Sequence, residues 1–198
     1  MSHGYEVVTS ERVYDGRVIA LRRDEVSMPG DTTSVRDVVE HPGAVAVVAL
    51  DEQERVVLVR QYRHPVGRPL EELPAGILDV EGEPAHETVK RELAEEAGLA
   101  ADQWDVLVDL LTSPGMSDEA SRIYLARGLR EVDRDVQEHE EAEMTSSRVP
   151  LDDVVRRVLS GEYENSLLVA GALAADRARR EAFRGLRPAD APWPARHP

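Results

Sequence analysis

The sequence predicts an α/β fold, a sandwich of strands and helices with a β-rich appendage in its N-terminal part. Two observations predict it. β-rich segments separated by turn residues fill the first 40 positions, and from residue 41 onward strand-like runs are interspersed with three helical segments. Mixed elements of this kind pack helices against a sheet around a shared core. The 198 residues, 41% of them apolar, suffice for one domain of catalytic size with an extra element.

The first 40 residues predict a three-stranded antiparallel meander. The expected strands are Tyr5–Val8, Arg17–Leu21 and Val35–Val39, and the expected turns are Asp15–Gly16 and Pro29–Asp31. Because three short strands are only marginally stable on their own, we expect residues 1–40 to pack against another surface.

A second domain is predicted over residues 41–185, ahead of a proline-rich flexible tail over 186–198. The apolar runs 44–50 and 56–63 flank a polar turn, a pattern that predicts a hairpin whose strands are buried on both faces. Further strands are expected at Glu71–Leu73, Trp104–Leu110, Arg122–Ala126 and Glu143–Val149. The expected helices are Pro84–Ala97, Asp152–Leu159 and Ser166–Phe183.

The charge balance excludes two classes of partner. The chain has 24 basic residues against 39 acidic ones, a formal net charge of −15. A nucleic-acid-binding face needs a basic stripe, and an anionic membrane surface repels such a chain. We therefore expect no nucleic acid and no membrane among its partners. An acidic enzyme can still bind phosphates if divalent cations stand between its carboxylates and the substrate.

The absence of cysteine removes disulfides, thiolate metal sites and cysteine nucleophiles. The first residues show no basic stretch followed by an apolar core, so no signal peptide is expected. The longest apolar run, Ala44–Leu50, is far shorter than the roughly 20 residues of a membrane helix. We expect a cytoplasmic protein.

The first predicted helix carries several acids on one side. At 100° per residue an apolar stripe runs through Val89 and Leu93, and Glu92 and Glu96 lie on its border one turn apart, with Glu95 close by. Like charges at this spacing repel by roughly a few tenths of a kcal/mol per pair. The helix dipole also disfavours acids near the C-terminal end. A divalent cation would turn this repulsion into ligation. A metal site and a solvated helix face are both compatible with the pattern alone.

The segment from Glu83 to Leu99, which we call the box, resembles the signature of the Nudix hydrolases. It consists of Glu, seven residues, then Arg-Glu-Leu-x-Glu-Glu-x-Gly-Leu, and every defined position matches. The family has five residues between a leading glycine and the first glutamate. Here six follow Gly76, and Gly82 occupies the position of the family's glutamate. The resemblance implies a Nudix-type α/β/α sandwich with a mixed sheet, and metal-dependent hydrolysis of a nucleoside diphosphate linked to another moiety.

The same resemblance implies roles for residues in and before the box. Glu92 and Glu96 would be the principal metal ligands, with Glu95 beside them, for two or three Mg²⁺ or Mn²⁺ ions per active site. Arg91 would orient the glutamates, and a surface ion pair is its alternative. The carbonyl of Ala75 resembles a further metal ligand of the ADP-ribose-cleaving branch.

Nearly the whole chain resembles the ADP-ribose pyrophosphatases of the family, in particular actinobacterial forms. The features that carry this resemblance are the runs Val45–Leu50 and Val59–Arg63, the segment Glu72–Gly76, the loop Ser113–Met116, and the β-rich N-terminal segment. In that loop Pro114 lies fifteen residues beyond Leu99, as in ADP-ribose enzymes. In such enzymes the N-terminal segment is exchanged across a homodimer. The resemblance therefore implies a homodimer that hydrolyses ADP-ribose to AMP and ribose 5-phosphate.

Substrate contacts are implied as well, and ordinary surface positions are the alternative for them. Arg36 and Arg63 would contact the phosphates, because planar guanidinium groups suit phosphate oxygens. Gly115 and Met116 belong to the loop expected to contact the substrate, and Glu119 would reach the terminal ribose.

The catalytic base is expected in the acidic segment 131–143, where a solvated charge run is the alternative. By resemblance a glutamate on this loop completes the site over the diphosphate, either as the catalytic base or as another metal ligand. Glu141 is the first choice and Glu140 the second.

Other functions stay open at this point. The substrate could be another nucleoside diphosphate sugar, a dinucleotide or an oxidised nucleotide. A Nudix-fold sensor would bind ADP-ribose without cleaving it. Such a protein should lack a box glutamate or carry a DNA-binding module, and this sequence shows neither. A purely structural acidic protein would bind neither Mg²⁺ nor Mn²⁺ specifically.

Overall fold

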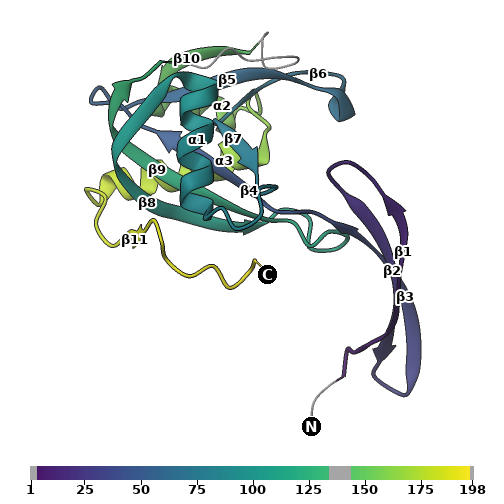
Figure 1. Ribbon diagram of the computed structural model, residues 1–198. Helices are drawn as coiled ribbons and strands as arrows, with labels where there is room; N and C mark the ends of the chain where they lie inside the picture. Colours follow the sequence, from purple (N-terminus) through teal and green to yellow (C-terminus); the bar gives the residue numbers. More distant parts are fainter. Residues whose placement is uncertain (1–3, 134–143, 197–198) are drawn as a thin grey trace. The chain divides into compact units, whose positions relative to one another are not determined.

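The computed structural model describes residues 4–133 and 144–196 (Figure 1). The chain divides into two compact units, which we describe separately. The meander unit comprises the residues up to Gly43 together with Leu111–Ala120, and the sandwich unit comprises Ala44–Leu110 and the residues from Ser121 onward. The sequence predicted domain boundaries after residues 40 and 185. It did not predict that residues 111–120 belong to the same unit as the meander.

The meander unit is a three-stranded antiparallel sheet in the order β1-β2-β3. Its strands are β1 (Val7–Asp15), β2 (Ala20–Met28) and β3 (Thr32–Glu40). The predicted meander is confirmed. The strands extend beyond their β-rich cores because polar pairs across neighbouring strands support them. Arg23, for example, lies opposite Asp37 and donates a hydrogen bond to it at 2.8 Å.

The sandwich unit contains two sheets, ordered β10-β5-β6 and β11-β8-β9-β4-β7. Its strands are β4 (Ala44–Ala49), β5 (Arg55–Arg63), β6 (Arg68–Glu72), β7 (Ala75–Ile77), β8 (Leu99–Leu111), β9 (Ala120–Glu131), β10 (Thr145–Pro150) and β11 (Arg187–Pro188). Its helices are α1 (Ala85–Ala97), α2 (Leu151–Leu159) and α3 (Ser166–Arg180), with a 3-10 turn at His64–Val66. Within the described residues no helix has the length and apolar character needed to span a membrane.

Alternate residues of β4 face two separate cores. Val45 and Val47 belong to a cluster with Val89 of α1, whereas Ala46 and Val48 belong to a cluster with residues of α2 and α3. Helices thus cover both faces of the sheet (Figure 1). β4 runs parallel to β9 and antiparallel to β7, so the sheet is mixed. The predicted α/β/α sandwich with a mixed sheet is confirmed.

The predicted hairpin of residues 44–50 and 56–63 is wrong. β4 and β5 lie in different sheets and share an isolated bridge between Leu50 and Val56. β4 pairs with β7 and β9, whereas β5 pairs with β6 and β10. Strands with two apolar faces are stable in the interior of a sheet, where each has a neighbour on both sides. The polar turn therefore moves the chain from one sheet to the other.

The predicted flexible tail packs against the sandwich unit as far as Trp193. β11 pairs with β8 at its start. Further along, the carbonyls of Ala191 and Pro192 accept hydrogen bonds at 2.7 and 3.0 Å from Arg122, which is only 2% exposed. The Arg122 guanidinium also lies over the Trp193 ring, 4.7 Å from its centre. Proline content favours disorder, but a buried arginine distant in sequence orders these residues.

We predict that Arg122→Met lowers the free energy of unfolding by about 3 kcal/mol. Arg122 pairs with Asp109 at 2.7 Å, and its removal also leaves the carbonyls of Ala191 and Pro192 without their hydrogen-bond donor. Arg187→Gln is the control, because Arg187 contacts the same carboxylate from a more exposed position and should contribute less than about 1 kcal/mol. Chemical denaturation followed by tryptophan fluorescence measures both variants. Equal stability of the two would contradict a special role for the buried arginine.

Candidate active site

The box glutamates lie on helix α1, whose limits follow from the local sequence. Pro84 occupies the N-cap, where a missing amide proton carries little penalty. At the other end Gly98 adopts a positive φ of 64°, and its amide donates to the Ala94 carbonyl at 2.9 Å. Val89 and Leu93 are buried in the core, so the box helix is held by its apolar stripe.

Glu96 is almost fully buried, with 7% of its surface exposed. Its Oε2 atom accepts a hydrogen bond of 2.9 Å from the backbone amide of Ala75. A buried carboxylate needs such a donor to offset the loss of water. The contact ties the last turn of α1 to the first residue of β7.

Glu92 approaches β7 one turn earlier, at Gly76. A Cβ atom placed on Gly76 would lie within 3.0 Å of the Oε1, Cδ and Cγ atoms of Glu92, closer than real Cβ contacts come. A larger residue at position 76 would therefore displace the Glu92 carboxylate from its place beside the β7 backbone. Together the two contacts bring Ala75, Glu92 and Glu96, the three predicted metal ligands, to one place.

Arg91 forms ion pairs with three of the five glutamates of the box. It lies 2.8 Å from Glu92, 2.9 Å from Glu95 and 3.3 Å from Glu83. The hydrogen bond from Arg91, followed by one from Thr88 at 2.8 Å, lowers the pKa of Glu83 below its ordinary value. Arg91 thus offsets the repulsion between neighbouring glutamates. Thr88, a fully buried residue in the first half of the helix, was not anticipated from the sequence.

The oxygen atoms around Gly76 suit a divalent cation. Glu92 and Glu96 bring carboxylates to the backbone at Ala75, and Mg²⁺ and Mn²⁺ take carboxylate and carbonyl oxygens. The missing Cβ at Gly76 leaves the Glu92 carboxylate its space, so these residues fit the metal ions expected from the sequence. No group of three Asp, Glu or His side chains among the described residues is arranged to hold a metal by side chains alone.

Arg63, the phosphate contact predicted at the end of β5, is held by Glu72 of β6. Two hydrogen bonds of 2.9 and 2.6 Å join its guanidinium to both carboxylate oxygens. Glu72 is only 3% exposed, so this buried carboxylate holds the Arg63 guanidinium in one orientation. This role of Glu72 was not predicted from the sequence. The position of this acid directly before the apolar Leu73 is the local feature that could have indicated a buried partner.

Four predicted substrate contacts belong to the meander unit, and the two predicted bases are not described. The four are Arg36, Gly115, Met116 and Glu119. Arg36 is exposed on β3, where it donates to the side chain of Ser34 and to the carbonyl of Val35. Glu119 accepts a hydrogen bond of 2.6 Å from Thr112. Glu141 and Glu140 lie outside the described residues.

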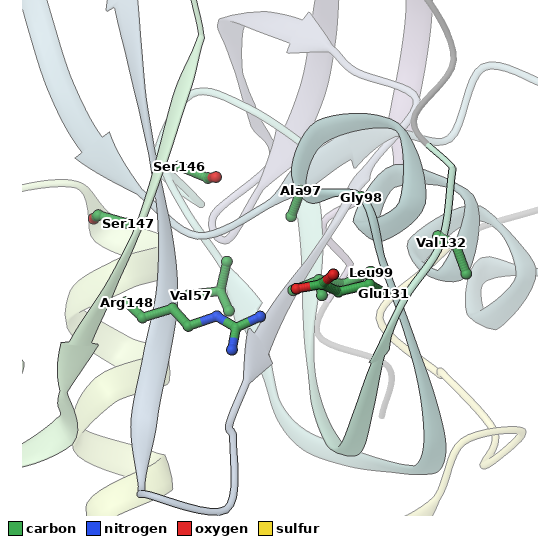
Figure 2. A pocket seen from close by; sticks show the side chains of 9 residues that line it. All are labelled: Val57, Ala97, Gly98, Leu99, Glu131, Val132, Ser146, Ser147 and Arg148. Carbon is green, nitrogen blue, oxygen red and sulfur yellow. The ribbon is translucent and has the colours of Figure 1, made fainter.

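A pocket of about 320 Å³ opens beside the C-terminal end of α1 (Figure 2). Its lining residues are Val57, Ala97, Gly98, Leu99, Glu131, Val132, Ser146, Ser147 and Arg148. In Figure 2 the side chains of Arg148 and Glu131 point toward one another from β10 and β9. The lining includes neither Glu92 nor Glu96, so this pocket is not formed by the box carboxylates.

We predict that Gly76→Ala weakens Mn²⁺ binding by about tenfold or more, because the added methyl group must displace the Glu92 carboxylate. Gly4→Ala is the control, since the nearest atom to a Cβ at Gly4 lies at 3.8 Å, an ordinary contact. Calorimetric titration with Mn²⁺ measures the affinity, and circular dichroism verifies that both variants fold. An unchanged affinity in folded Gly76→Ala would exclude the proposed metal position.

Comparison with known proteins identifies the family. The Nudix domain matches residues 40–167. The ADP-ribose pyrophosphatase of Mycobacterium tuberculosis (strain ATCC 25618 / H37Rv) is 53% identical over 191 residues, which cover 96% of this chain and 92% of that protein. The ADP-ribose pyrophosphatase of Bacillus subtilis (strain 168) is 36% identical over 159 residues, or 79% and 84% of the two chains. A solved structure titled as an ADP compounds hydrolase shares the fold, with a TM-score of 0.77 at 20% identity over 90% of this chain and 96% of that one. The resemblance seen in the box is therefore confirmed, and the chain belongs to the Nudix family.

Proposed function

We propose that this Nudix protein hydrolyses the diphosphate bond of ADP-ribose, giving AMP and ribose 5-phosphate. The observation that carries the proposal is the approach of Glu92 and Glu96 to the backbone at Ala75 and Gly76. Two relatives that align with most of the chain are named ADP-ribose pyrophosphatases, which supports the choice of substrate within the family.

The box residues would prepare a cation-dependent site. Glu92, Glu96 and the carbonyl of Ala75 would hold two or three Mg²⁺ or Mn²⁺ ions, with Glu95 beside them. When bound, such ions neutralise the diphosphate and lower the pKa of a nearby water. Arg91 keeps the glutamates in place through its ion pairs.

The chemical step would break one phosphoric anhydride bond. The water oxygen forms a bond to one phosphorus while the bridging P–O bond breaks, and Glu141, or Glu140 in its place, takes the water proton. Arg63, fixed by Glu72, would hold a substrate phosphate through the part of its guanidinium that stays exposed.

Recognition of the rest of the substrate would use residues of the meander unit. Arg36 would contact a phosphate, Gly115 and Met116 would line the substrate, and Glu119 would bind the terminal ribose. A cytoplasmic location accords with a nucleotide substrate and with a sequence that contains no cysteine.

We predict that Glu96→Gln lowers kcat for ADP-ribose by about 10²-fold or more while the fold persists. The amide side chain can still accept the hydrogen bond from Ala75, but it loses the charge that would bind metal. Glu87→Gln is the matched control, because Glu87 lies on the same helix and pairs with Lys90 at an exposed position. The measurement is AMP release with Mg²⁺, with and without a chelator.

Near-normal turnover of Glu96→Gln, or turnover of the wild type that survives chelation, would contradict the metal assignment. A substrate panel should include other nucleoside diphosphate sugars, dinucleotides and an oxidised nucleotide. Faster cleavage of one of these than of ADP-ribose would replace the proposed substrate. Tight ADP-ribose binding without any cleavage would indicate a sensor.

We also propose that the meander forms a homodimer. Its sheet leaves large apolar side chains exposed within the chain, among them Val7, Val8, Tyr14 and Val35. Large apolar side chains that a sheet leaves exposed are stabilised when a partner surface covers them.

We predict that Val35→Asp shifts the protein from dimer to monomer, because a charge on the apolar surface must be desolvated on association. The control is Thr32→Asp, which places the same charge on the same strand but on the opposite face from Val35. Light scattering after size-exclusion chromatography gives both masses. A monomeric wild type at micromolar concentration would contradict the dimer.

A further inference from the structure

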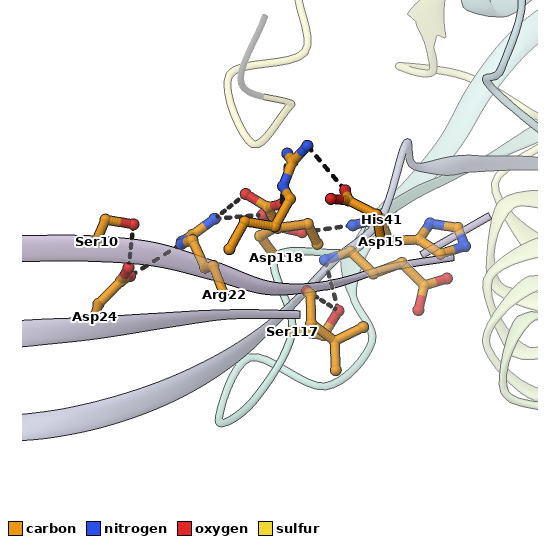
Figure 3. Close-up of polar contacts among 11 residues, drawn as sticks. Ser10, Asp15, Arg22, Asp24, His41, Ser117 and Asp118 are labelled. Carbon is orange, nitrogen blue, oxygen red and sulfur yellow. Dashed lines mark hydrogen bonds and ion pairs between the residues drawn. The ribbon is translucent and has the colours of Figure 1, made fainter. Parts of the chain in front are cut away.

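An ion-pair network holds the meander unit together around Arg22 of β2 (Figure 3). The guanidinium of Arg22 donates to Asp24 at 2.9 Å, to Glu40 at 3.1 Å and to Asp118 at 3.3 Å. Asp24 and Glu40 belong to β2 and β3, whereas Asp118 belongs to the segment 111–120 far along the chain. The Arg22 side chain thus joins the three-stranded sheet to the segment 111–120. In the sequence this segment lies between two parts of the sandwich unit.

Arg22 is itself fixed by a buried acid. Asp24 is 4% exposed and also accepts a hydrogen bond of 2.7 Å from Ser10 of β1. The bond from Ser10, followed by that from Arg22, lowers the pKa of Asp24. The carboxylate therefore stays charged and keeps the guanidinium in one orientation.

Backbone hydrogen bonds attach the same segment to β3 at Val39. The amide of Val39 donates to the Met116 carbonyl at 2.8 Å, and the amide of Asp118 donates to the Val39 carbonyl at 3.2 Å. The Ser117 hydroxyl donates to that carbonyl at 3.1 Å. The segment therefore continues the sheet for one parallel bridge, between Val39 and Ser117.

Asp118 closes the loop that this bridge begins. Its Oδ2 atom faces Arg22, and its Oδ1 atom accepts a hydrogen bond of 2.9 Å from the amide of His41. Inside the loop the amides of Met116 and Ser117 donate to the Ser113 carbonyl at 3.0 and 2.9 Å. The loop 113–119 is thus fixed at Val39, at Asp118 and by its own turn.

We propose that Arg22 and Asp118 are positioning residues for substrate recognition, which hold the loop 113–119 in the conformation that presents Gly115, Met116 and Glu119. The inference rests on the proposed function, because those three residues are its proposed substrate contacts. Neither Arg22 nor Asp118 needs to touch the substrate. Their effect is to reduce the number of conformations that the loop must give up when ADP-ribose binds.

The test compares Arg22→Gln and Asp118→Asn with Arg23→Gln in steady-state hydrolysis of ADP-ribose. We expect each of the first two variants to raise KM by about tenfold and to change kcat by less than about twofold, as loss of binding without loss of chemistry requires. Arg23→Gln should leave both constants near those of the wild type, because Arg23 pairs with the exposed Asp37 on the same sheet.

A second measurement separates positioning from general destabilisation. Hydrogen exchange of a peptide covering 111–120 should become faster in Asp118→Asn, while exchange in β5 stays unchanged. A variant that is only less stable would lose active protein, which lowers apparent kcat and leaves KM unaltered. Unchanged KM in both variants, or an equal rise in Arg23→Gln, would overturn the inference.

Calorimetric titration with ADP-ribose keeps the two proposals distinguishable. If the wild type binds ADP-ribose without cleaving it, the proposed reaction fails, but affinity in Arg22→Gln and Asp118→Asn should still fall by about tenfold. Equal affinity in all three proteins would overturn the positioning role. No binding by the wild type would overturn both.

Discussion

The close approach of helix α1 to the β7 backbone is the contact on which the proposed site depends. The absence of a side chain at Gly76 admits the Glu92 carboxylate, and the Ala75 amide holds the Glu96 carboxylate one turn later. The apolar stripe of the same helix is buried in the core through Val89 and Leu93. The packing that stabilises the fold therefore also determines where α1 holds its carboxylates. As a result the helix can move little relative to β7.

Much of this could be predicted from the sequence because it depends on local periodicity. The helical repeat alone places Glu92 and Glu96 one turn apart at the border of the apolar stripe, and Gly98 defines the end of the helix. The β-rich segments and turn residues likewise predict the meander. The close approach of Glu92 to Gly76 is different, because these residues are sixteen positions apart and only the folded structure brings them together.

The predictions that were wrong or incomplete share one physical cause, because each concerns a segment whose structural partners lie far away in the sequence. The apolar runs of β4 and β5 show that both strands are buried, but a strand with two apolar faces carries no pattern that selects its neighbours. The tail is ordered by Arg122, and the segment 111–120 is attached at Val39. In both cases backbone carbonyls or amides are satisfied by groups that no short window of sequence contains. Composition indicated disorder or an ordinary loop at these places.

Three arginine side chains connect parts of the chain whose pairing cannot be predicted from helix and strand patterns. Arg122, Arg63 and Arg22 each bind two or more acceptors, and Arg22 and Arg122 connect segments that are far apart in the chain. A planar guanidinium suits this task because it donates several hydrogen bonds in fixed directions.

The box has fewer cations than acids. From Glu83 to Leu99 the only basic residues are Lys90 and Arg91, set against five glutamates. The box thus has an excess of negative charge on one helix, and its Glu96 carboxylate lies against the backbone at Ala75. Self-repulsion there would destabilise the fold if nothing balanced it, and divalent cations together with a diphosphate would balance it. The same acidity that led us to expect no nucleic acid among the partners would, at this one place, favour a phosphate ligand bridged by metal ions.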